Sequence, residues 1–247
     1  MFATPVIRAA RHGVAKAVAF ALPPRCAACG TIVGGDHQLC LDCWSALDFL
    51  DDGGCPVCAR PADHPGQEGL HCAACLADPP PFDRLRAGVA YGEVARGIVL
   101  KLKYGRQTGL AELIARQLAR STDGLAPDTL VACVPLHRWR IWSRGFNQSA
   151  LIGRRVARRH ALRFVPDLLV RTRRTPPLKG LNPTQRARTV RGAFAVKPHV
   201  TVKGATILLV DDVYTTGATV RACAAILRRA GAARVEVLCW ARVLRDD

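Results

Sequence analysis

Eight of the eleven cysteines form four Cys-x-x-Cys pairs within one stretch of 50 residues. The pairs are Cys26/Cys29, Cys40/Cys43, Cys55/Cys58 and Cys72/Cys75. Two thiolates separated by two residues can bind one ion from a tight turn, and Zn²⁺ takes four such ligands in a tetrahedron. The sequence therefore predicts two zinc ions, which are structural because four thiolates leave no coordination position open for water.

Other arrangements of these cysteines fit the same spacing. A disulfide scaffold is not expected, because the chain lacks a credible secretion signal. It also carries a long conventional domain after the cysteines, unlike small disulfide-rich proteins. Among metal sites, consecutive pairs can share an ion, or alternate pairs can do so in a cross-braced arrangement. The short intervening loops favour consecutive pairs, with 26–43 around one ion and 55–75 around the other.

The N-terminus carries apolar residues at helical spacing, among them Val6, Ala10 and Val14. Arg8 and Lys16 interrupt the apolar run, so we expect a short amphipathic helix that packs on the protein. A secretion or membrane-surface signal is the alternative. No apolar run approaches the roughly 20 residues of a transmembrane helix, so no membrane span is expected.

Residues 206–220, TILLVDDVYTTGATV, join an apolar strand to an acidic pair and a turn rich in hydroxyls. The carboxylates of Asp211 and Asp212 can accept hydrogen bonds from the vicinal hydroxyls of a ribose. Free N–H groups at the start of the next helix, with three threonine hydroxyls, suit a phosphate. Gly217 permits close approach of the backbone. An ordinary capped helix would account for one Asp and one Thr, but not for the whole series.

A second region offers groups for anionic oxygens. An apolar strand ends at 134–137, and Arg144 and Gly145 come just before a helix. We expect Arg144 and the backbone near Gly145 to be available to anionic oxygens.

Residues 171–191 contain three prolines and little apolar pattern, which is typical of a mobile lid over a ligand. Lys179, Arg186 and Arg188 are candidate lid cations. Each of them is equally well explained as a solvated loop charge.

The remaining pattern predicts alternating strands and helices. Strands are expected at 86–91, 130–134, 193–196, 206–210 and 234–241, and helices at 94–104, 110–120, 147–160 and 218–230. Because the strands are apolar throughout, the fold class is α/β with a mostly parallel sheet. The proline-rich stretch 78–81 reads as a linker, which divides the chain into domains 1–80 and 81–247.

The formal charge of +17 is unevenly distributed. Residues 1–80 carry a balance of −3 and residues 81–247 a balance of +20, so a polyanion should be attracted to the second part. Between His137 and Arg191 there are 15 Lys or Arg and one acidic residue, interleaved with Trp139, Trp142 and Phe146. Basic and aromatic side chains together can neutralise a phosphate backbone and stack on bases, which predicts binding of nucleic acid. Alternatively, the arginines bind only pyrophosphate and the tryptophans lie in the core.

The acidic pair and the turn closely resemble the motif with which type I phosphoribosyltransferases bind 5-phosphoribosyl 1-pyrophosphate (PRPP). The resemblance implies that Asp211 and Asp212 contact the ribose 2′- and 3′-hydroxyls, and that the turn cradles the 5′-phosphate. It also implies that His137, Arg144 and Gly145 form the pyrophosphate loop. The implied site comprises Asp211, Asp212, Val213, Tyr214, Thr215, Thr216, Gly217, Ala218 and Thr219. Members that act on 6-oxopurines have an acidic base where Thr215 stands, and a hydroxyl cannot replace it at neutral pH, so that chemistry is disfavoured.

The order of motifs along the chain is similar to that of the ComF/GntX family. These motifs are the four cysteine pairs, Tyr91 and Lys103, PLH…RGFNQ, GAF and VDDVYTTGAT. The resemblance covers residues 26 to about 241. It implies a type I phosphoribosyltransferase-like domain with an N-terminal zinc-ribbon module, in a bacterial cytoplasmic protein associated with natural competence and imported single-stranded DNA.

Three functions are compatible with these features. The first is a PRPP-binding accessory protein of single-stranded DNA uptake. The second is an active phosphoribosyltransferase that transfers ribosyl 5-phosphate to an unidentified amine or base, with Mg²⁺ held through the substrate oxygens. The third treats the zinc module as a docking surface for a helicase-like competence protein.

Overall fold

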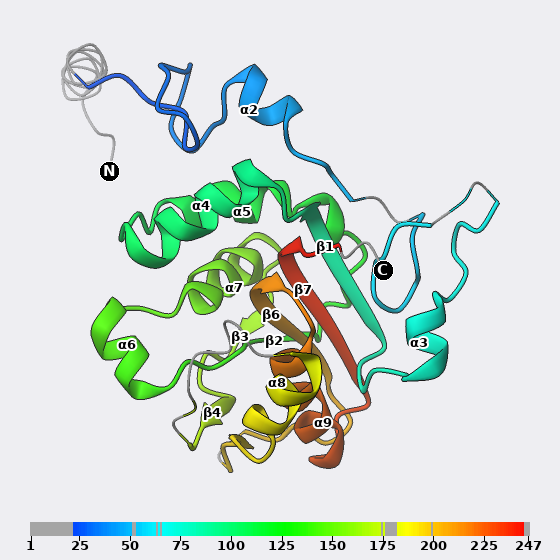
Figure 1. Cartoon of the computed structure of the whole chain (residues 1–247). Coiled ribbons are helices and arrows are strands. Elements are labelled where there is room, and N and C mark those ends of the chain that lie inside the picture. The colour runs from blue at the N-terminus through cyan, green and yellow to red at the C-terminus, as the bar shows by residue number, and fades with distance from the viewer. Residues whose placement is uncertain are drawn as a thin grey trace. The chain divides into compact units, whose positions relative to one another are not determined.

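The computed structural model describes residues 22–50, 53–62, 64, 66–173, 175, 182–198 and 200–244 (Figure 1). The amphipathic helix predicted around Val6 and Ala10 lies outside these residues. The chain forms two compact units, Met1–Ala46 and Leu47–Asp247. The last two cysteine pairs thus share a unit with the residues that follow them. The division into domains at residues 80/81 stays a prediction.

The described part of the first unit contains the first two cysteine pairs and consists mainly of turns. Its first turn is closed by hydrogen bonds from Gly30 N to Cys26 O (3.0 Å) and from Cys26 N to Thr31 O (2.7 Å). Gly30 has a φ of +85°, which glycine adopts at little cost. The helix α2 (Leu41–Ser45) follows and begins directly after Cys40.

The second unit is built on a five-stranded parallel sheet with the strand order β1-β7-β6-β2-β3. Its strands are β1 (Arg84–Ala90), β2 (Leu130–Cys133), β3 (Arg163–Phe164), β6 (Thr206–Tyr214) and β7 (Arg234–Arg242). The central strands are buried almost throughout, as expected for a sheet with both faces covered. The predicted α/β fold class with a mostly parallel sheet is confirmed.

Helices cover both faces of this sheet (Figure 1). On one face lie α4 (Glu93–Tyr104), α5 (Leu110–Gln117) and α7 (Gln148–Arg159), and on the other lie α8 (Pro183–Val190) and α9 (Ala218–Arg229). Alternate residues of β6 face opposite sides, because successive side chains of a strand point apart. Leu209 shares a buried core with Leu227 of α9, whereas Val210 lies beside Gly153 of α7.

Several elements differ from the predicted ones. The helix α6 (Arg138–Arg144) and the short 3-10 turn Arg120–Thr122 were not expected. The strand β6 continues to Tyr214 instead of ending at 210, because β7 pairs with it as far as Tyr214↔Arg242. The strand β5 (Phe194–Val196) lies outside the main sheet and pairs antiparallel with β4 (Leu169–Arg171). A short helix, α3 (Ala73–Ala77), carries Cys75.

Of the described helices, none combines the length and the apolar character that crossing a bilayer requires. The three isolated cysteines, Cys133, Cys223 and Cys239, are all buried in the second unit, as predicted. Burial raises the pKa of the Cys133 thiol to about 12. This agrees with a packing role for these cysteines and not with a role as nucleophiles.

Candidate functional site

The strand order places a topological switch point between β2 and β6. The chain leaves β2 through α6 and α7 and reaches β3 on one side, whereas it leaves β6 through α9 and reaches β7 on the other. Open α/β sheets bind ligands in the crevice outside the carboxyl ends of two such strands. Asp211 and Asp212 lie near the carboxyl end of β6, at this crevice.

The two carboxylates have different partners. Asp211 Oδ1 accepts hydrogen bonds from Ser149 Oγ and from the backbone N–H of Asp212, both at 2.9 Å. Asp212 is only 4% exposed, and its Oδ2 lies 2.5 Å from Lys103 Nζ at the end of α4. The charge of Asp212 is therefore compensated inside the protein, and that of Asp211 is less fully so.

These surroundings shift the protonation of Asp211. Burial, and then the neighbouring charge of Asp212, raise the pKa of Asp211 to about 7, although Lys103 acts in the opposite direction. Burial alone would lower the pKa of Lys103, but the charges of Asp212 and Asp211 outweigh it and raise that pKa. With this pKa Asp211 is about half ionised at neutral pH, so the acidic pair carries less than its full negative charge, next to a stable ammonium group.

The turn that follows β6 opens directly into α9. Gly217 caps the helix with φ +72°, and the turn lines a small recess together with the end of β6. The lining residues are Asp211, Val213, Tyr214, Thr215, Thr216, Gly217, Ala218, Thr219 and Val220. Backbone N–H groups and hydroxyls at the start of a helix form an environment suited to a phosphate. Residues 215–217, between β6 and α9, are called the phosphate turn below.

A larger cleft of about 680 Å³ adjoins this recess. Its lining includes five cations: Lys103, Arg106, Arg140, Arg144 and Arg171. Asp211 and Asp212 are the acidic residues in the same lining, so positive charge predominates among the described residues of the cleft. A ligand with several negative charges is therefore favoured.

Of the three residues predicted for the pyrophosphate loop, only Arg144 lines the cleft. Arg144 lines the cleft, where it donates to Gln148 Oε1 (3.2 Å) and lies 5.0 Å over the ring of Tyr104. His137 caps α6 by accepting from Trp139 N, and Gly145 ends α6 with φ +84°. Neither is among the described residues that line the cleft.

The predicted lid segment contains regular structure. Residues 183–190 form α8, and Arg186 Nη1 donates to Thr215 Oγ1 (3.4 Å), which joins this helix to the phosphate turn. Arg188 is exposed. Lys179 lies outside the described residues.

Sequence reasoning missed several residues of the cleft. Lys103 is assigned to the cleft only through the family resemblance. Sequence reasoning does not assign Tyr104, Arg140 and Arg171 to the site. They come from α4, α6 and β4, far from the motif along the chain. The Lys-Tyr pair at the end of an amphipathic helix was the available signal, but without the strand order nothing links it to Asp212.

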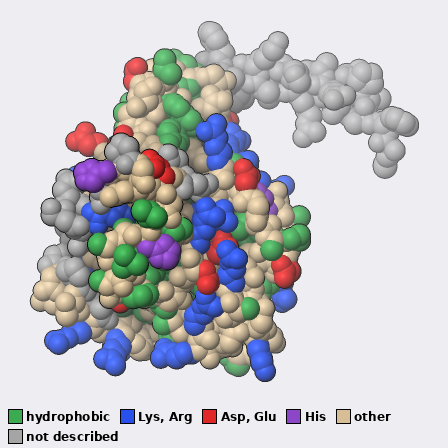
Figure 2. All heavy atoms as spheres, turned by 90° about the vertical axis from the view of Figure 1, so that its right-hand side faces the viewer, with side chains coloured by type: hydrophobic (Ala, Val, Ile, Leu, Met, Phe, Trp, Pro, Cys, Tyr) green, Lys and Arg blue, Asp and Glu red, His purple; other side chains and the backbone are tan. Residues whose placement is uncertain are grey.

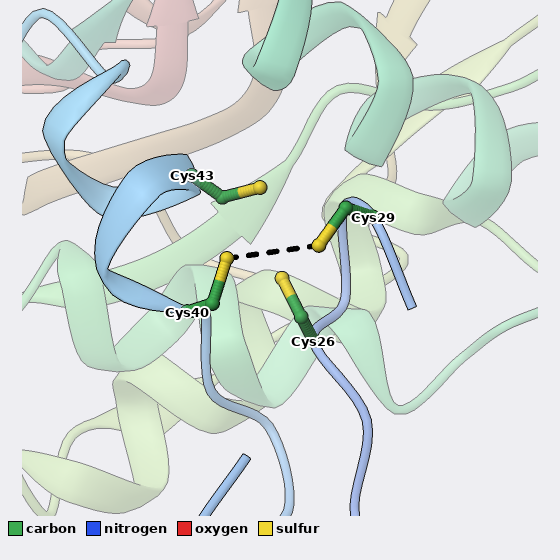
Figure 3. A group of neighbouring side chains, drawn as sticks. All are labelled: Cys26, Cys29, Cys40 and Cys43. Atoms are coloured by element: carbon green, nitrogen blue, oxygen red, sulfur yellow. Dashed lines mark hydrogen bonds between the residues drawn. The ribbon is translucent and has the colours of Figure 1, made fainter. Parts of the chain in front are cut away.

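The first cysteine cluster lies in the first unit. The sulfurs of Cys26, Cys29, Cys40 and Cys43 point toward one another and all lie within 4.8 Å (Figure 3). The Sγ atoms of Cys29 and Cys40 are 3.6 Å apart, far longer than a disulfide bond. The edge of a zinc tetrathiolate tetrahedron is roughly 3.8 Å, as follows from Zn–S bonds of about 2.3 Å. The cluster therefore fits a zinc ion.

The second cluster belongs to the α/β unit. Cys55, Cys58, Cys72 and Cys75 also lie within 4.8 Å of one another, with 3.6 Å between the Sγ atoms of Cys58 and Cys72. Both clusters use consecutive pairs, so the consecutive grouping is confirmed and the cross-braced one is not observed. Two four-cysteine sites of this geometry are consistent with two structural zinc ions.

The tryptophans of α6 lie at the surface. Trp139 and Trp142 are 52% and 81% exposed and pack edge to face, 6.1 Å apart. The alternative that they belong to the core is therefore wrong. Four arginines of α7 (Arg154, Arg155, Arg158 and Arg159) line a separate basic groove with Glu112 and Leu151. On another face, Figure 2 shows Lys and Arg side chains spread among acidic ones.

A parallel sheet with an acidic pair and a phosphate turn at its switch point, in a chain with two four-cysteine clusters, defines a phosphoribosyltransferase-type protein with zinc ribbons. A family model described as a double zinc ribbon domain matches residues 17–76, and a phosphoribosyl transferase domain model matches residues 153–246. The DNA utilization protein YhgH of Escherichia coli O6:H1 is 38% identical over 217 residues, which cover 85% of this chain and 92% of that protein. The chain belongs to the ComF family.

More distant relatives cover similar lengths. The competence protein F of Haemophilus influenzae is 27% identical over 82% of this chain and 96% of its own length. The competence protein ComFC of Bacillus subtilis is 24% identical, with 80% of this chain and 81% of that protein covered. Among solved structures, an adenine phosphoribosyltransferase of Thermoanaerobacter pseudethanolicus is 17% identical over 59% of this chain and 86% of its own, with a TM-score of 0.37.

Proposed function

We propose that this chain is a PRPP-binding, phosphoribosyltransferase-like protein that assists the handling of single-stranded DNA. One observation carries the first half of the proposal. At the switch point of the sheet, an acidic pair, a phosphate-sized turn and a cleft with five cations adjoin one another. PRPP has vicinal hydroxyls, a 5′-phosphate and a pyrophosphate, which match these three parts in turn.

Each part has a chemical task in the proposed complex. The Asp211 carboxylate accepts hydrogen bonds from the ribose hydroxyls, and Lys103 holds Asp212 in place through their ion pair. The turn at Gly217 offers N–H groups and hydroxyls to the 5′-phosphate. Arg144 and Arg140 face the pyrophosphate. Magnesium, which favours oxygen ligands, would be held through the substrate oxygens next to the acidic pair.

The first test is calorimetric titration of PRPP with magnesium into the wild-type protein and an Asp211→Asn variant. Asparagine retains an acceptor for Ser149 but loses the charge. We expect wild type to bind and the variant to bind about 10–100-fold more weakly, because hydrogen bonds to a charged acceptor contribute roughly 1.5–3 kcal/mol each.

Asp167→Asn is the matched control, because Asp167 is about half exposed and forms an ion pair with Lys197 on the surface. It should bind PRPP like wild type. Absence of heat from wild type at millimolar PRPP would overturn the proposed ligand. Equal affinity of the Asp211→Asn variant would overturn the assigned site.

The second half of the proposal concerns nucleic acid. It is supported by the exposed pair Trp139 and Trp142 on α6, a helix whose Arg140 and Arg144 line the cleft. Aromatic faces next to cations stack bases and neutralise phosphates at the same time. The names of the curated relatives, a DNA utilization protein and two competence proteins, point in the same direction.

A salt series with a single-stranded oligonucleotide, with and without PRPP, tests this half. Trp142→Ala should weaken binding by about 5–100-fold, the value of one stacked base, while Trp142→Phe keeps most of the affinity. Replacing the four arginines of α7 should instead reduce the dependence on salt. If wild type shows no salt-dependent binding at low ionic strength, the DNA proposal fails.

The alternative function is active transfer of ribosyl 5-phosphate to an amine or base. Release of pyrophosphate in the presence of an acceptor separates it from simple PRPP binding. The helicase-like partner of the zinc module stays a prediction from the family resemblance.

A further inference from the structure

Arg242, the last residue of β7, is a buried cation for which the described residues supply no ion pair with a carboxylate. It is 9% exposed, and its Nη2 donates to Cys58 Sγ at 3.6 Å. Its Nε and Nη1 are buried and have no hydrogen-bond partner in the described part of the chain. A buried guanidinium needs a negative charge close by, because desolvation of an uncompensated ion costs several kcal/mol.

The second cysteine cluster can supply that charge. Four thiolates around one Zn²⁺ carry a net charge of −2, and Cys58 is one of the four. Groups that donate to metal-bound ligands orient them and tune the affinity of the site. Arg242 occupies such a position toward Cys58.

Arg242 also contacts Tyr214, the last residue of β6, which directly precedes the phosphate turn. Its guanidinium carbon lies 5.2 Å from the ring centroid of Tyr214, and the next residue, Val243, donates its N–H to Tyr214 O (2.9 Å). The hydroxyl end of Tyr214 lies directly against Gly217, so closely that no side chain fits there. One guanidinium therefore contacts both the metal cluster and the residue that supports the turn.

A second connection joins the same two regions. Arg221 lies in the first turn of α9, where its backbone N–H donates to Gly217 O (2.7 Å). Its Nη2 forms an ion pair with Asp78 (2.7 Å), three residues after Cys75. The turn is thus connected to the second cluster through Arg242 and again through Arg221. The first cluster belongs to the other compact unit.

We propose that Arg242 is a positioning residue that couples the second cysteine cluster to the phosphate turn. With a metal ion bound, the cluster holds the guanidinium under Tyr214, and Tyr214 holds Gly217 in its binding conformation. Loss of that ion weakens binding of the sugar phosphate, whereas loss of the ion in the first cluster does not. The inference rests on the proposed function, because it is a statement about the same ligand site.

The test compares matched cysteine variants of the full chain. Cys29→Ser and Cys58→Ser each remove the second ligand of the first pair in their cluster. Zinc content is measured by mass spectrometry and PRPP affinity by calorimetry. Each variant should lose one zinc ion. Cys29→Ser should bind PRPP like wild type, and Cys58→Ser about tenfold or more weakly, a typical coupling between sites.

Because removal of a metal ligand can also prevent folding, Arg242→Met and Arg242→Lys provide a second route. With cadmium-113 in both sites, Arg242→Met should move only one of the two NMR resonances, and a chelator should remove that ion faster. PRPP binding should weaken by about tenfold, with partial recovery in Arg242→Lys. Unchanged PRPP affinity together with an unchanged resonance would overturn the coupling.

Failure of the proposed function gives a different result. If wild type does not bind PRPP, the coupling is still tested by Tyr214→Leu, which alters the turn and touches no cysteine. A moved resonance of the second cluster would then support the connection through Arg242. Resonances that stay in place would overturn it.

Discussion

At the scale of single residues, the two adjacent aspartates of the acidic pair have different surroundings. Asp212 is paired with Lys103 inside the protein, whereas Asp211 accepts hydrogen bonds from Ser149 and from the backbone of Asp212. Burial next to another carboxylate keeps the pKa of Asp211 near 7. If PRPP is the ligand, as proposed, the half-protonated Asp211 lowers the repulsion that this polyanion meets at the site.

The raised pKa predicts how stability depends on pH. The unfolded Asp211 loses its proton near its ordinary pKa of about 4, whereas the folded one retains it up to about pH 7. Between these values the folded state binds more protons, so its stability falls as pH rises. Asp211→Asn removes this penalty and should be more stable than wild type, by on the order of 1–3 kcal/mol at pH 8.

Urea unfolding of both proteins from pH 4 to pH 8 measures the difference. The difference in unfolding free energy should increase from pH 4 to pH 8, because only wild type has the Asp211 carboxyl group, which loses its proton in this range. Asp167→Asn is the matched control, because it also removes one carboxylate but leaves Asp211 and its surroundings unchanged. A difference between Asp211→Asn and wild type that is constant over the whole range would contradict the assigned pKa.

At the scale of elements, the junction of β6 and α9 determines the geometry of the turn. β6 extends to Tyr214 because β7 pairs with it that far, and α9 begins only four residues later. Such a short connection requires a left-handed residue, and Gly217 provides it with φ +72°. The helix start is thereby held close to the acidic pair.

Gly217→Ala should therefore damage the turn. The left-handed conformation costs alanine about 1 kcal/mol, and its Cβ would overlap the ring of Tyr214. We expect a loss of roughly 2–4 kcal/mol in unfolding free energy and PRPP binding too weak to measure. Gly204→Ala is the control, because its φ is +73° but its Cβ would meet open space. An equal effect of both substitutions would mean that Tyr214 does not restrict the turn.

At the scale of the whole molecule, the two cysteine clusters have different surroundings, although both are built from two Cys-x-x-Cys pairs. The first lies in the compact unit that ends at Ala46, and the second packs on the core that includes β1 and β7. Val57, between Cys55 and Cys58, contacts this core and accepts a hydrogen bond from Leu85 N (2.7 Å). The second cluster is therefore a part of the α/β unit, and its metal ion is expected to influence that unit.

Local sequence was sufficient for features that depend on short stretches of chain. The cysteine spacing predicts both four-cysteine sites, the apolar strands predict the parallel sheet, and 206–220 predicts the acidic pair before a phosphate turn. Each of these is encoded within a few residues by turn chemistry or by periodicity. The cysteines and the turn residues find their partners close by along the chain, whereas the pairing of the strands joins distant segments such as β1 and β7.

Tertiary structure alone decided which distant residues meet. Lys103 reaches Asp212, and Arg242 reaches Cys58, across more than 100 residues of sequence. It also exposed Trp142 and moved β5 out of the main sheet. These outcomes depend on strand order and on which face of a helix finds cover. Both are properties of the packed chain. The free energy of burial depends on which distant segments pack together, and the sequence of one segment does not specify its partner.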